Sequence, residues 1–418
     1  MNIYINYKIY IKNGENSSLY GMLFLGGGYM FSSLAGIGQA SATRIVEMLL
    51  QQAIEVHASD IHIEPLDEAV RVRFRRDGVL LTAASIPLAK ADMVTARIKV
   101  LARMDIADKR RPQDGRIVWD SHEKTVDLRV STMPTVRGEK TVLRLLDTTH
   151  VELKLETLGI TPSVCQSIRQ IVSQNRGLFL FSGPTGSGKT STLYAVLREL
   201  HKTEVSIATL EDPVEYKVNG ICQSQIHEKG GLVFQNGLRA LLRQDPDILV
   251  IGEIRDGETA NIAVRAALTG HLVLSTVHTA SAAEVPERLI DMGVEPYLVA
   301  DALSGITSQR LARRICRHCR GKEELRKTCT ACFSTGYEGR ICLCEIMPVK
   351  QQLRKCIRQG DGMDEMEAAA ITDGAVLMKE VLLYHIQKGY TDWQEIQRVY
   401  DNREVSYGYR RVNRNRHC

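Results

Sequence analysis

Apolar residues recur at helical spacing from Thr43 to Val56 and then give way to short stretches in which apolar and polar residues alternate. The stretches Val70–Phe74 and Val126–Val130 have the two-residue period of strands, with arginines on one face. Two Asp-Gly pairs, Asp77-Gly78 and Asp114-Gly115, are predicted turns. Residues from about 40 to 147 are therefore expected to form a small α+β domain with an arginine-rich polar face.

A different pattern begins near Leu153. Short, continuous apolar runs are separated by helical segments, the first of which is Ser191–Leu200. Continuous runs of this kind are typical of parallel strands buried on both faces, so an α/β core is predicted. The runs are Leu178–Phe181, Val205–Leu210, Ile248–Ile251 and Leu272–Thr276, and further helical segments follow from about Lys350 to Tyr400.

Composition adds little beyond excluding disordered, collagen-like and membrane-embedded classes. The chain has 418 residues, 44% of them hydrophobic, and 54 Lys plus Arg against 49 Asp plus Glu, a net charge of only +5. The charge-free stretch Leu19–Gly38 contains six glycines, which favours an irregular extension over a spanning helix or signal peptide. The basic stretch Arg410–Arg416 near the end of the chain is predicted to be solvated.

A glycine-rich loop carries the strongest chemical signal. It lies between a predicted buried strand and a predicted helix, and its residues match the phosphate-binding loop pattern in full. Backbone N–H groups would surround the β-phosphate, Lys189 would reach the β- and γ-phosphate oxygens, and Thr190 would supply a hydroxyl to Mg²⁺. ATP and Mg²⁺ are therefore the expected cofactors. The candidate binding residues are Gly183, Pro184, Thr185, Gly186, Ser187, Gly188, Lys189, Thr190 and Ser191.

Two acidic positions and two histidines follow this loop. Glu253 ends an apolar strand and is the candidate for positioning the metal and the attacking water. Three acids lie within the five residues Glu211–Glu215, and Glu211 is the candidate for polarising that water. His271 and His278 bracket the next strand as candidate sensors of the γ-phosphate, with His271 favoured. Pro286 is expected to interrupt the helix after the second histidine.

Four of the ten cysteines lie in two Cys-x-x-Cys pairs separated by nine residues. Four thiolates at this spacing suit a closed, structural Zn²⁺ site, so Zn²⁺ is the third expected cofactor. The candidate ligands are Cys316, Cys319, Cys329 and Cys332. Cys342 and Cys344 are either core residues or competing ligands, and a core position is favoured.

Several sequence blocks in one order resemble the assembly ATPases of type II secretion and type IV pilus systems over residues 41 to about 400. The blocks include Ala58–Pro65, Pro112–Arg116, the phosphate-binding loop, Glu211–Glu215, Arg243–Asp256 and Leu268–His271. The tetracysteine insert also resembles that of assembly ATPases and is not expected of retraction ATPases.

The resemblance implies a RecA-like P-loop ATPase core preceded by a PAS-like α+β domain, with a zinc insert and a helical C-terminal region. The implied segments are an extension (1–40), the PAS-like domain (41–147), a linker (148–156), the ATPase domain (157–310), the tetracysteine insert (311–345), a helical region (346–405) and a basic tail (406–418).

The resemblance also implies a homohexamer on the cytoplasmic face of the inner membrane, docked on platform proteins of the secretion or pilus machine, with no span of its own. Arginines of both domains would meet the phosphates, and the matching residues are Arg129, Arg144, Arg239, Arg243 and Arg255. The resulting hypothesis is an ATP-hydrolysing motor that drives pilus or pseudopilus assembly.

Two alternatives stay open at the level of sequence. One is a DNA-translocating ATPase, although the weak net charge and the absence of an aromatic-interleaved basic stretch favour no nucleic acid partner. The other is a non-catalytic scaffold that binds ATP without hydrolysing it.

Overall fold

The computed structural model divides the chain into two compact units, Met1–Thr149 and His150–Cys418. It describes residues 23–25, 28–30, 34, 36–121, 125–146 and 153–400. The predicted basic tail lies outside the described residues, as do most of the N-terminal extension and part of the linker. No helix among the residues that are described is long and apolar enough to cross a membrane.

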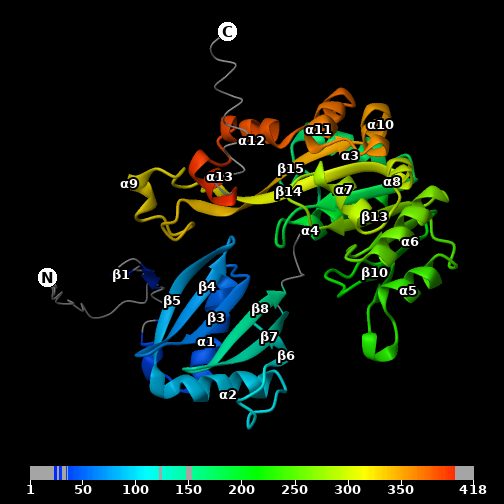
Figure 1. The fold of residues 1–418 in the computed structure, drawn as a ribbon. Helices are drawn as coiled ribbons and strands as arrows, with labels where there is room; N and C mark the ends of the chain where they lie inside the picture. Colours follow the sequence, from blue (N-terminus) through cyan, green and yellow to red (C-terminus); the bar gives the residue numbers. More distant parts are fainter. Residues whose placement is uncertain are drawn as a thin grey trace. The chain divides into compact units, whose positions relative to one another are not determined.

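The first unit is a six-stranded antiparallel sheet with two helices on one face (Figure 1). Its strand order is β5-β4-β3-β8-β7-β6. The elements are β1 (Leu23–Leu25), β2 (Gly28–Met30), α1 (Ala42–Glu55), β3 (Asp60–Pro65), β4 (Ala69–Arg76), β5 (Val79–Pro87), α2 (Ala91–Leu101), β6 (Gln113–Asp120), β7 (Thr125–Thr135) and β8 (Gly138–Leu146).

Local sequence explains these elements. Ser41 caps α1 by accepting a hydrogen bond from the Arg44 N–H at 3.3 Å. On β4 every second residue is buried, and the residues between them include arginines, as the alternating pattern predicts. Asp77 and Gly78 both have positive φ angles in the turn from β4 to β5, which confirms the first predicted turn.

The second predicted turn is wrong, because Asp114 and Gly115 lie inside β6 and Gly115 pairs with Val130 of β7. A glycine is needed here for close packing: a Cβ at Gly115 would lie 2.6 Å from the carbonyl oxygen of Ala102, just after α2. The sequence signal was therefore real, but it marked a close approach of two backbones.

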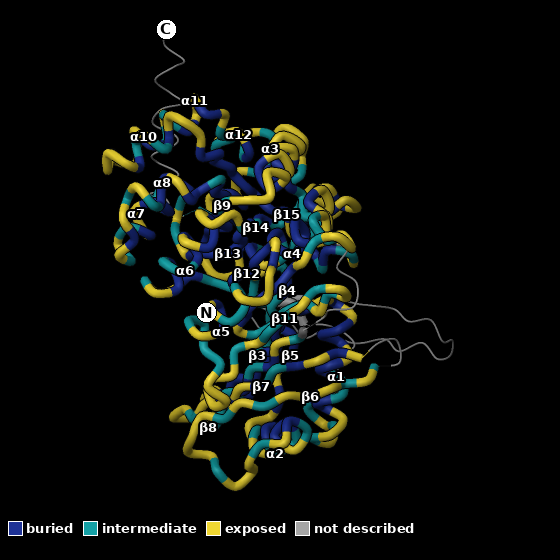
Figure 2. The backbone as a smooth tube through the Cα atoms, turned by 90° about the vertical axis from the view of Figure 1, so that its right-hand side faces the viewer, coloured by how far each residue is buried: buried dark blue, intermediate teal, exposed yellow. Residues whose placement is uncertain are grey.

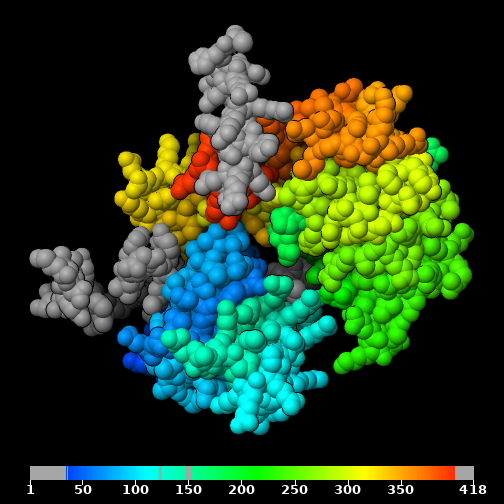
Figure 3. All heavy atoms as spheres, in the orientation of Figure 1, coloured from blue at the N-terminus to red at the C-terminus, as the bar shows by residue number. Residues whose placement is uncertain are grey.

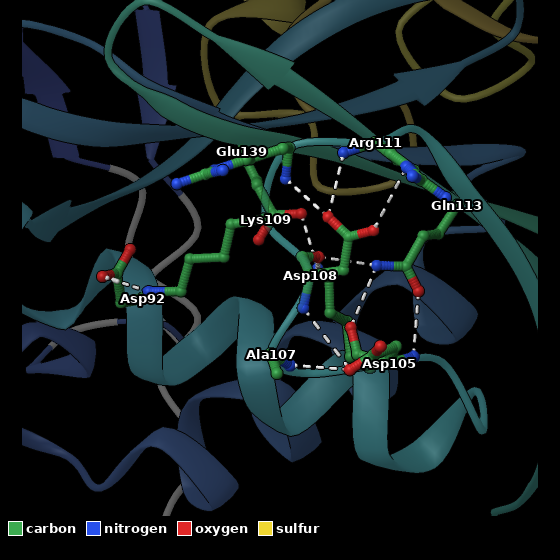
Figure 4. Close-up of polar contacts among 10 residues, drawn as sticks. Asp92, Asp105, Ala107, Asp108, Lys109, Arg111, Gln113 and Glu139 are labelled. Atoms are coloured by element: carbon green, nitrogen blue, oxygen red, sulfur yellow. Dashed lines mark hydrogen bonds and ion pairs between the residues drawn. The ribbon is translucent and has the colours of Figure 1, made fainter.

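The connection from α2 to β6 is held by hydrogen bonds from side chains at its two ends (Figure 4). Gln113 accepts from the Asp105 N–H at 2.9 Å and donates to the carbonyl oxygens of Asp105 and Asp108 at 2.9 and 2.7 Å. The buried Lys99 ammonium donates to the Asp108 carbonyl at 2.8 Å and pairs with Glu139 at 2.6 Å. These bonds fix the chain where it enters β6.

The second unit has a seven-stranded sheet in the order β11-β10-β12-β13-β9-β14-β15. All neighbouring strands are parallel except the last pair. The strands are β9 (Gly177–Ser182), β10 (Ile207–Glu211), β11 (Cys222–Gln225), β12 (Ile248–Ile251), β13 (Leu272–Val277), β14 (Leu303–Ile315) and β15 (Tyr337–Pro348). The predicted parallel α/β core is confirmed.

Helices cover both faces of this sheet, and its central strands β9, β12 and β13 are almost wholly buried (Figure 2). On β9, Leu178 and Leu180 join one apolar cluster, whereas Phe179 and Phe181 join the cluster on the opposite face. The helices are α3 (Pro162–Val172), α4 (Lys189–Leu200), α5 (Phe234–Leu241), α6 (Gly257–Leu268), α7 (Glu284–Asp291), α8 (Pro296–Ala302), α9 (Glu323–Arg326), α10 (Gln351–Gln359), α11 (Met363–Thr372), α12 (Met378–Gln387) and α13 (Trp393–Val399).

Pro286 does not interrupt a helix, contrary to the expectation from sequence. It is the third residue of α7, and the N–H groups of the first helical turn have no intrahelical acceptor. A proline there loses no hydrogen bond. Cys342 and Cys344 are both buried on β15, which confirms that they are core residues.

Candidate nucleotide site and metal centre

The phosphate-binding loop lies at the carboxyl edge of the parallel strands, between β9 and the N-terminus of α4. Gly183, Gly186 and Gly188 have φ angles of 138°, 77° and 91°, a region that side chains disfavour. A Cβ at Gly183 would lie 2.6 Å from the Gln309 carbonyl oxygen of β14. The glycines are therefore required by the geometry of the loop, which allows its backbone N–H groups to surround an anion.

The remaining loop residues divide into exposed and buried positions. Pro184, Thr185 and Thr190 are exposed, and Ser191 is partly buried. The Ser187 side chain is buried, and its hydroxyl has no hydrogen-bond partner among the described residues. An orphaned hydroxyl inside an anion-binding loop fits a phosphate oxygen as its missing partner.

Lys189 is buried, with 8% of its surface exposed. Its ammonium donates to the carbonyl oxygens of Gly183 and Pro184 at 2.7 and 3.0 Å and lies 3.4 Å from Nδ1 of His278. Burial lowers the pKa of Lys189 to about 8, against an opposing effect of the nearby Glu253 carboxylate. The lysine is thus a desolvated cation whose hydrogen-bond partners are two neutral carbonyl groups and the His278 ring.

Glu253 follows β12 and reaches the same place. Its carboxylate pairs with the Arg255 guanidinium at 2.5 Å and lies 3.7 Å from Nε2 of His278. Burial, with the neighbouring Lys189 cation, lowers the pKa of His278, so this imidazole is neutral at physiological pH. The structure therefore brings together Lys189, Glu253, Arg255 and His278 beside the phosphate-binding loop.

Glu211 ends β10 and is buried. Its carboxylate accepts hydrogen bonds from the Tyr194 hydroxyl at 2.5 Å, the Thr209 hydroxyl at 2.7 Å and the Gln223 amide at 3.3 Å. Burial and the Glu211 carboxylate raise the pKa of Tyr194, which stays a donor. Three donors hold Glu211 in one orientation between β10 and α4, and its role toward water stays a prediction.

His271 lies at the other edge of the sheet. It precedes β13, and its carbonyl oxygen accepts from the N–H of Gly177, the first residue of β9. Its ring is 3.0 Å from the Ala266 carbonyl and 3.2 Å from the Thr269 hydroxyl. Within this chain the structure therefore brings His278, rather than the favoured His271, to the phosphate-binding loop.

The other predicted arginines of this unit, Arg239 and Arg243, make their contacts elsewhere. Arg239, on α5, pairs with Glu258 at 2.8 Å. Arg243 donates to the Arg239 carbonyl at 2.9 Å. Both are exposed at the surface of the unit, and their role toward phosphate stays a prediction.

Arg310 of β14 is a cation at this site that sequence reasoning missed. Its guanidinium is buried and donates to the carbonyl oxygens of Ala280 and Gln309 at 2.8 and 3.1 Å. Its charge also contributes to the lowered pKa of Lys189. Arg310 thus ties the segment after His278 to the strand beside the loop. The sequence pattern did not mark β14 as a strand, because several of its buried residues, such as Gln309, are polar.

A second polar anchor holds the same segment. Glu345 of β15 accepts from the Ala282 N–H at 3.0 Å through one oxygen and from the Met378 N–H at 3.0 Å through the other. Met378 is the first residue of α12. The buried carboxylate therefore joins the segment that follows β13 to a C-terminal helix.

In the first unit, Arg129 and Arg144 lie opposite one another on β7 and β8. The row continues to Arg116 on β6 and, through Asp60 on β3, to Arg75 on β4. Asp60 pairs with Arg144 at 3.0 Å. Like charges directly opposite are unfavourable across a sheet, so this row is suited to an external anion. Arg116 and Arg75 were missed because strand register cannot be read from sequence.

On the same face of the sheet, the Glu64 carboxylate offsets the charge of three further cations. It pairs with Arg71, Arg73 and Lys140 at 3.1, 2.8 and 3.1 Å. Burial alone would raise its pKa, but the hydrogen bonds from Arg73 and Lys140 lower the pKa of Glu64 to about 2. A carboxylate within the sheet therefore offsets the cations around Glu64, unlike the directly opposed pair Arg116 and Arg129.

The four predicted metal ligands gather in the connection between β14 and β15. The sulfur atoms all lie within 4.8 Å of one another, and the Cys316–Cys329 and Cys319–Cys332 sulfur distances are 3.9 and 3.7 Å. Tetrahedral zinc with bonds of about 2.3 Å places its sulfur ligands about 3.8 Å apart. The cluster fits Zn²⁺, and four protein ligands would leave no position for catalysis.

Together, the loop at the carboxyl edge of a parallel sheet, the buried lysine and the acid after β12, which β13 separates from the loop strand β9, define a RecA-like P-loop nucleotide-binding protein. Known structures agree with this fold. The Legionella pneumophila ATPase DotB is 21% identical with a TM-score of 0.66, covering 84% of this chain and 94% of its own. The pilus retraction motor PilT is 24% identical with a TM-score of 0.53, covering 84% and 98%.

Sequence comparisons give the family. The family described as "Type II/IV secretion system protein" matches residues 37–398. The type II secretion system protein HxcR of Pseudomonas aeruginosa is 46% identical over 363 residues, covering 86% of this chain and 77% of its own. The type IV pilus assembly ATPase PilB of Thermus thermophilus is 40% identical over 382 residues, covering 86% and 43%. The chain belongs to the type II/IV secretion system protein family of ATPases.

Proposed function

We propose that this chain is a hexameric ATP-hydrolysing motor that powers assembly of a pilus or pseudopilus, in type II protein secretion or type IV pilus biogenesis. The names of its relatives, a type II secretion system protein and a type IV pilus assembly ATPase, support the process. The tetracysteine cluster supports assembly over retraction. The proposed location is the cytoplasmic face of the inner membrane, on platform proteins of the machine.

One observation carries the enzymatic part of the proposal: a buried ammonium, a carboxylate and a neutral imidazole meet beside the phosphate-binding loop. Lys189 would stabilise charge on the β- and γ-phosphate oxygens, and Thr190 at the start of α4 would hold Mg²⁺, the ion that shields the phosphates. Glu253 would position the attacking water. His278, 3.7 Å from Glu253, can donate a hydrogen bond without adding a charge.

The arginine row of the first unit supplies the remaining groups. Arg129 and Arg144 would act on the phosphates only when the units close or when chains assemble in a ring, so hydrolysis would depend on assembly. Arg239 and Arg243 are candidates for the same task at a subunit boundary. This arrangement would couple phosphate chemistry to movement of one unit against the other.

The test is ATP turnover by the purified chain as a function of its oligomeric state, with and without DNA. We expect that ATP turnover rises with hexamer formation and does not change when DNA is added. Stimulation by DNA would favour a translocase instead, and ATP binding without turnover in the hexamer would favour a scaffold.

A further inference from the structure

The second unit contains a large basic groove that the proposed motor chemistry does not use. It measures about 900 Å³ and lies between the end of α3, the start of β14 and much of α10. Figure 3 shows the segment of α10 and α11, in orange, at the surface of this unit. Its volume is in the range of sites that bind small molecules.

The charged residues that line this groove are all positive. Four cations line it, and its described lining includes no acidic residue. Lys350 and Lys355 are exposed, and Arg358 pairs with Asp301 outside the lining. The amides Gln174 and Gln352 add neutral donors. The four cations are Lys350, Arg354, Lys355 and Arg358.

Arg354 lines the groove and carries an unsatisfied hydrogen-bond donor. Its Nε is buried and has no hydrogen-bond partner among the described residues. A buried, charged donor is costly when unpaired, and the planar fork of an arginine matches phosphate oxygens. The backbone N–H groups at the start of α10 are already used, because Asp373 accepts from those of Lys350, Gln352 and Leu353 at 3.2, 3.3 and 2.9 Å. Recognition would therefore come from the side chains.

The groove is separate from the nucleotide site of the same chain. Ser304, in its lining, donates to the carbonyl oxygen of Leu178 at 3.1 Å, near the beginning of β9. The phosphate-binding loop follows Ser182, at the end of the same strand. The two sites thus lie at opposite edges of the sheet and can be occupied at the same time.

We propose that this groove is a second anion site, which binds a small phosphate-bearing molecule. Its size fits a ligand with more than one phosphate, and its cations lie at successive turns of α10, so they can contact neighbouring phosphates. Lys355 and Arg354 would supply most of the attraction, because Arg358 is already paired with Asp301.

The experiment uses the full chain with its phosphate-binding loop saturated by Mg²⁺ and ADP, and inorganic pyrophosphate as the probe in calorimetric titration. We expect one pyrophosphate per chain, with affinity reduced at least about tenfold in an Arg354→Gln/Lys355→Gln variant. A charge-matched control, Arg265→Gln/Lys388→Gln, changes exposed cations on α6 and at the end of α12 and should bind like the unmodified chain.

Because Arg354 is partly buried, the single exposed change Lys355→Glu guards against a folding defect. It should weaken pyrophosphate binding while leaving ADP affinity unchanged. Absence of pyrophosphate binding in the ADP-loaded chain would overturn the proposal. Equal weakening in the α6/α12 control would also overturn it, since that result would mean non-specific attraction to net charge.

Discussion

Lys189 is the residue on which the nucleotide site depends, since it brings a positive charge into a place with little water. The cost of that burial is visible in its pKa, which is lowered to about 8. A phosphate at the loop would favour the charged form again. Proton binding to this lysine and nucleotide binding are therefore linked.

The first prediction follows from this linkage. Above pH 8 the ligand-free lysine becomes neutral, so nucleotide affinity should fall by up to about tenfold per pH unit between pH 8 and 9.5 and change little between pH 7 and 8. Fluorescence titration with a labelled nucleotide would measure it. Lys189→Arg keeps its charge over this range and should remove the pH dependence. If the affinity of the Lys189→Arg variant still falls with pH, the titrating group is not Lys189.

The second prediction concerns Glu253, which touches Arg255 and His278. Glu253→Gln keeps the shape of the side chain but removes the charge that would position metal and water. ATP affinity should change little, and turnover should fall by about 10²-fold or more. Rapid-quench measurement of a single turnover separates the two quantities. Normal turnover would remove Glu253 from the mechanism.

Single residues also show where sequence reasoning reached its limit. The glycine pattern identified the loop because its φ angles demand glycine. The choice between the two histidines could have been made from the predicted parallel sheet, because the carboxyl ends of parallel strands share one edge, and His278 follows β13 whereas His271 precedes it. The strand order then places His278 at the edge where β9 ends.

At the level of elements, β14 and β15 form a long antiparallel pair that carries the cysteine cluster in its connection. The spacing of the cysteines predicted a metal site, but no pattern in the sequence predicted these strands. Buried polar residues of β14 obscure its apolar pattern, because they lie beside the phosphate-binding loop rather than in the apolar core. The short strands β9, β12 and β13 are wholly apolar or nearly so and were predicted.

The third prediction tests the metal centre. Protein purified without chelators should contain about one Zn²⁺ per chain, and Cys316→Ser should lose it. Cys222→Ser, a change at an exposed cysteine outside the cluster, should keep it. Elemental analysis gives the metal content, and hydrogen exchange should show loss of protection confined to the β14–β15 connection. Zinc-free unmodified protein would contradict the assignment.

At the scale of the whole molecule, the chain consists of two units with separate cores, each of which presents a part of the proposed mechanism. The second unit contains the loop, the lysine and Glu253. The first presents a row of arginines in which cations lie directly opposite one another. Asp60 offsets the charge of Arg144, whereas Arg116 and Arg129 lie directly opposite one another, a like-charge pair that disfavours the sheet and suits contact with an anion.

The fourth prediction follows. Arg129→Ala and Arg144→Ala should each reduce steady-state ATP turnover by about 10³-fold or more while changing nucleotide affinity much less. Arg137→Ala, in the hairpin between β7 and β8, is a matched control and should be near normal. Turnover per chain should also rise with protein concentration as rings form. If both variants turn over ATP within about twofold of the unmodified chain, the two-unit mechanism is wrong.

The two carboxylate oxygens of Glu345 couple two distant segments of the second unit. One oxygen holds the segment after β13 and the other holds the first residue of α12, so neither segment can shift relative to the other without the loss of a hydrogen bond. A change of phosphate state sensed at His278 would thereby reach the C-terminal helices as displacement. Glu345→Gln, which leaves one of these two N–H groups without its acceptor, would therefore uncouple the segment after β13 from α12.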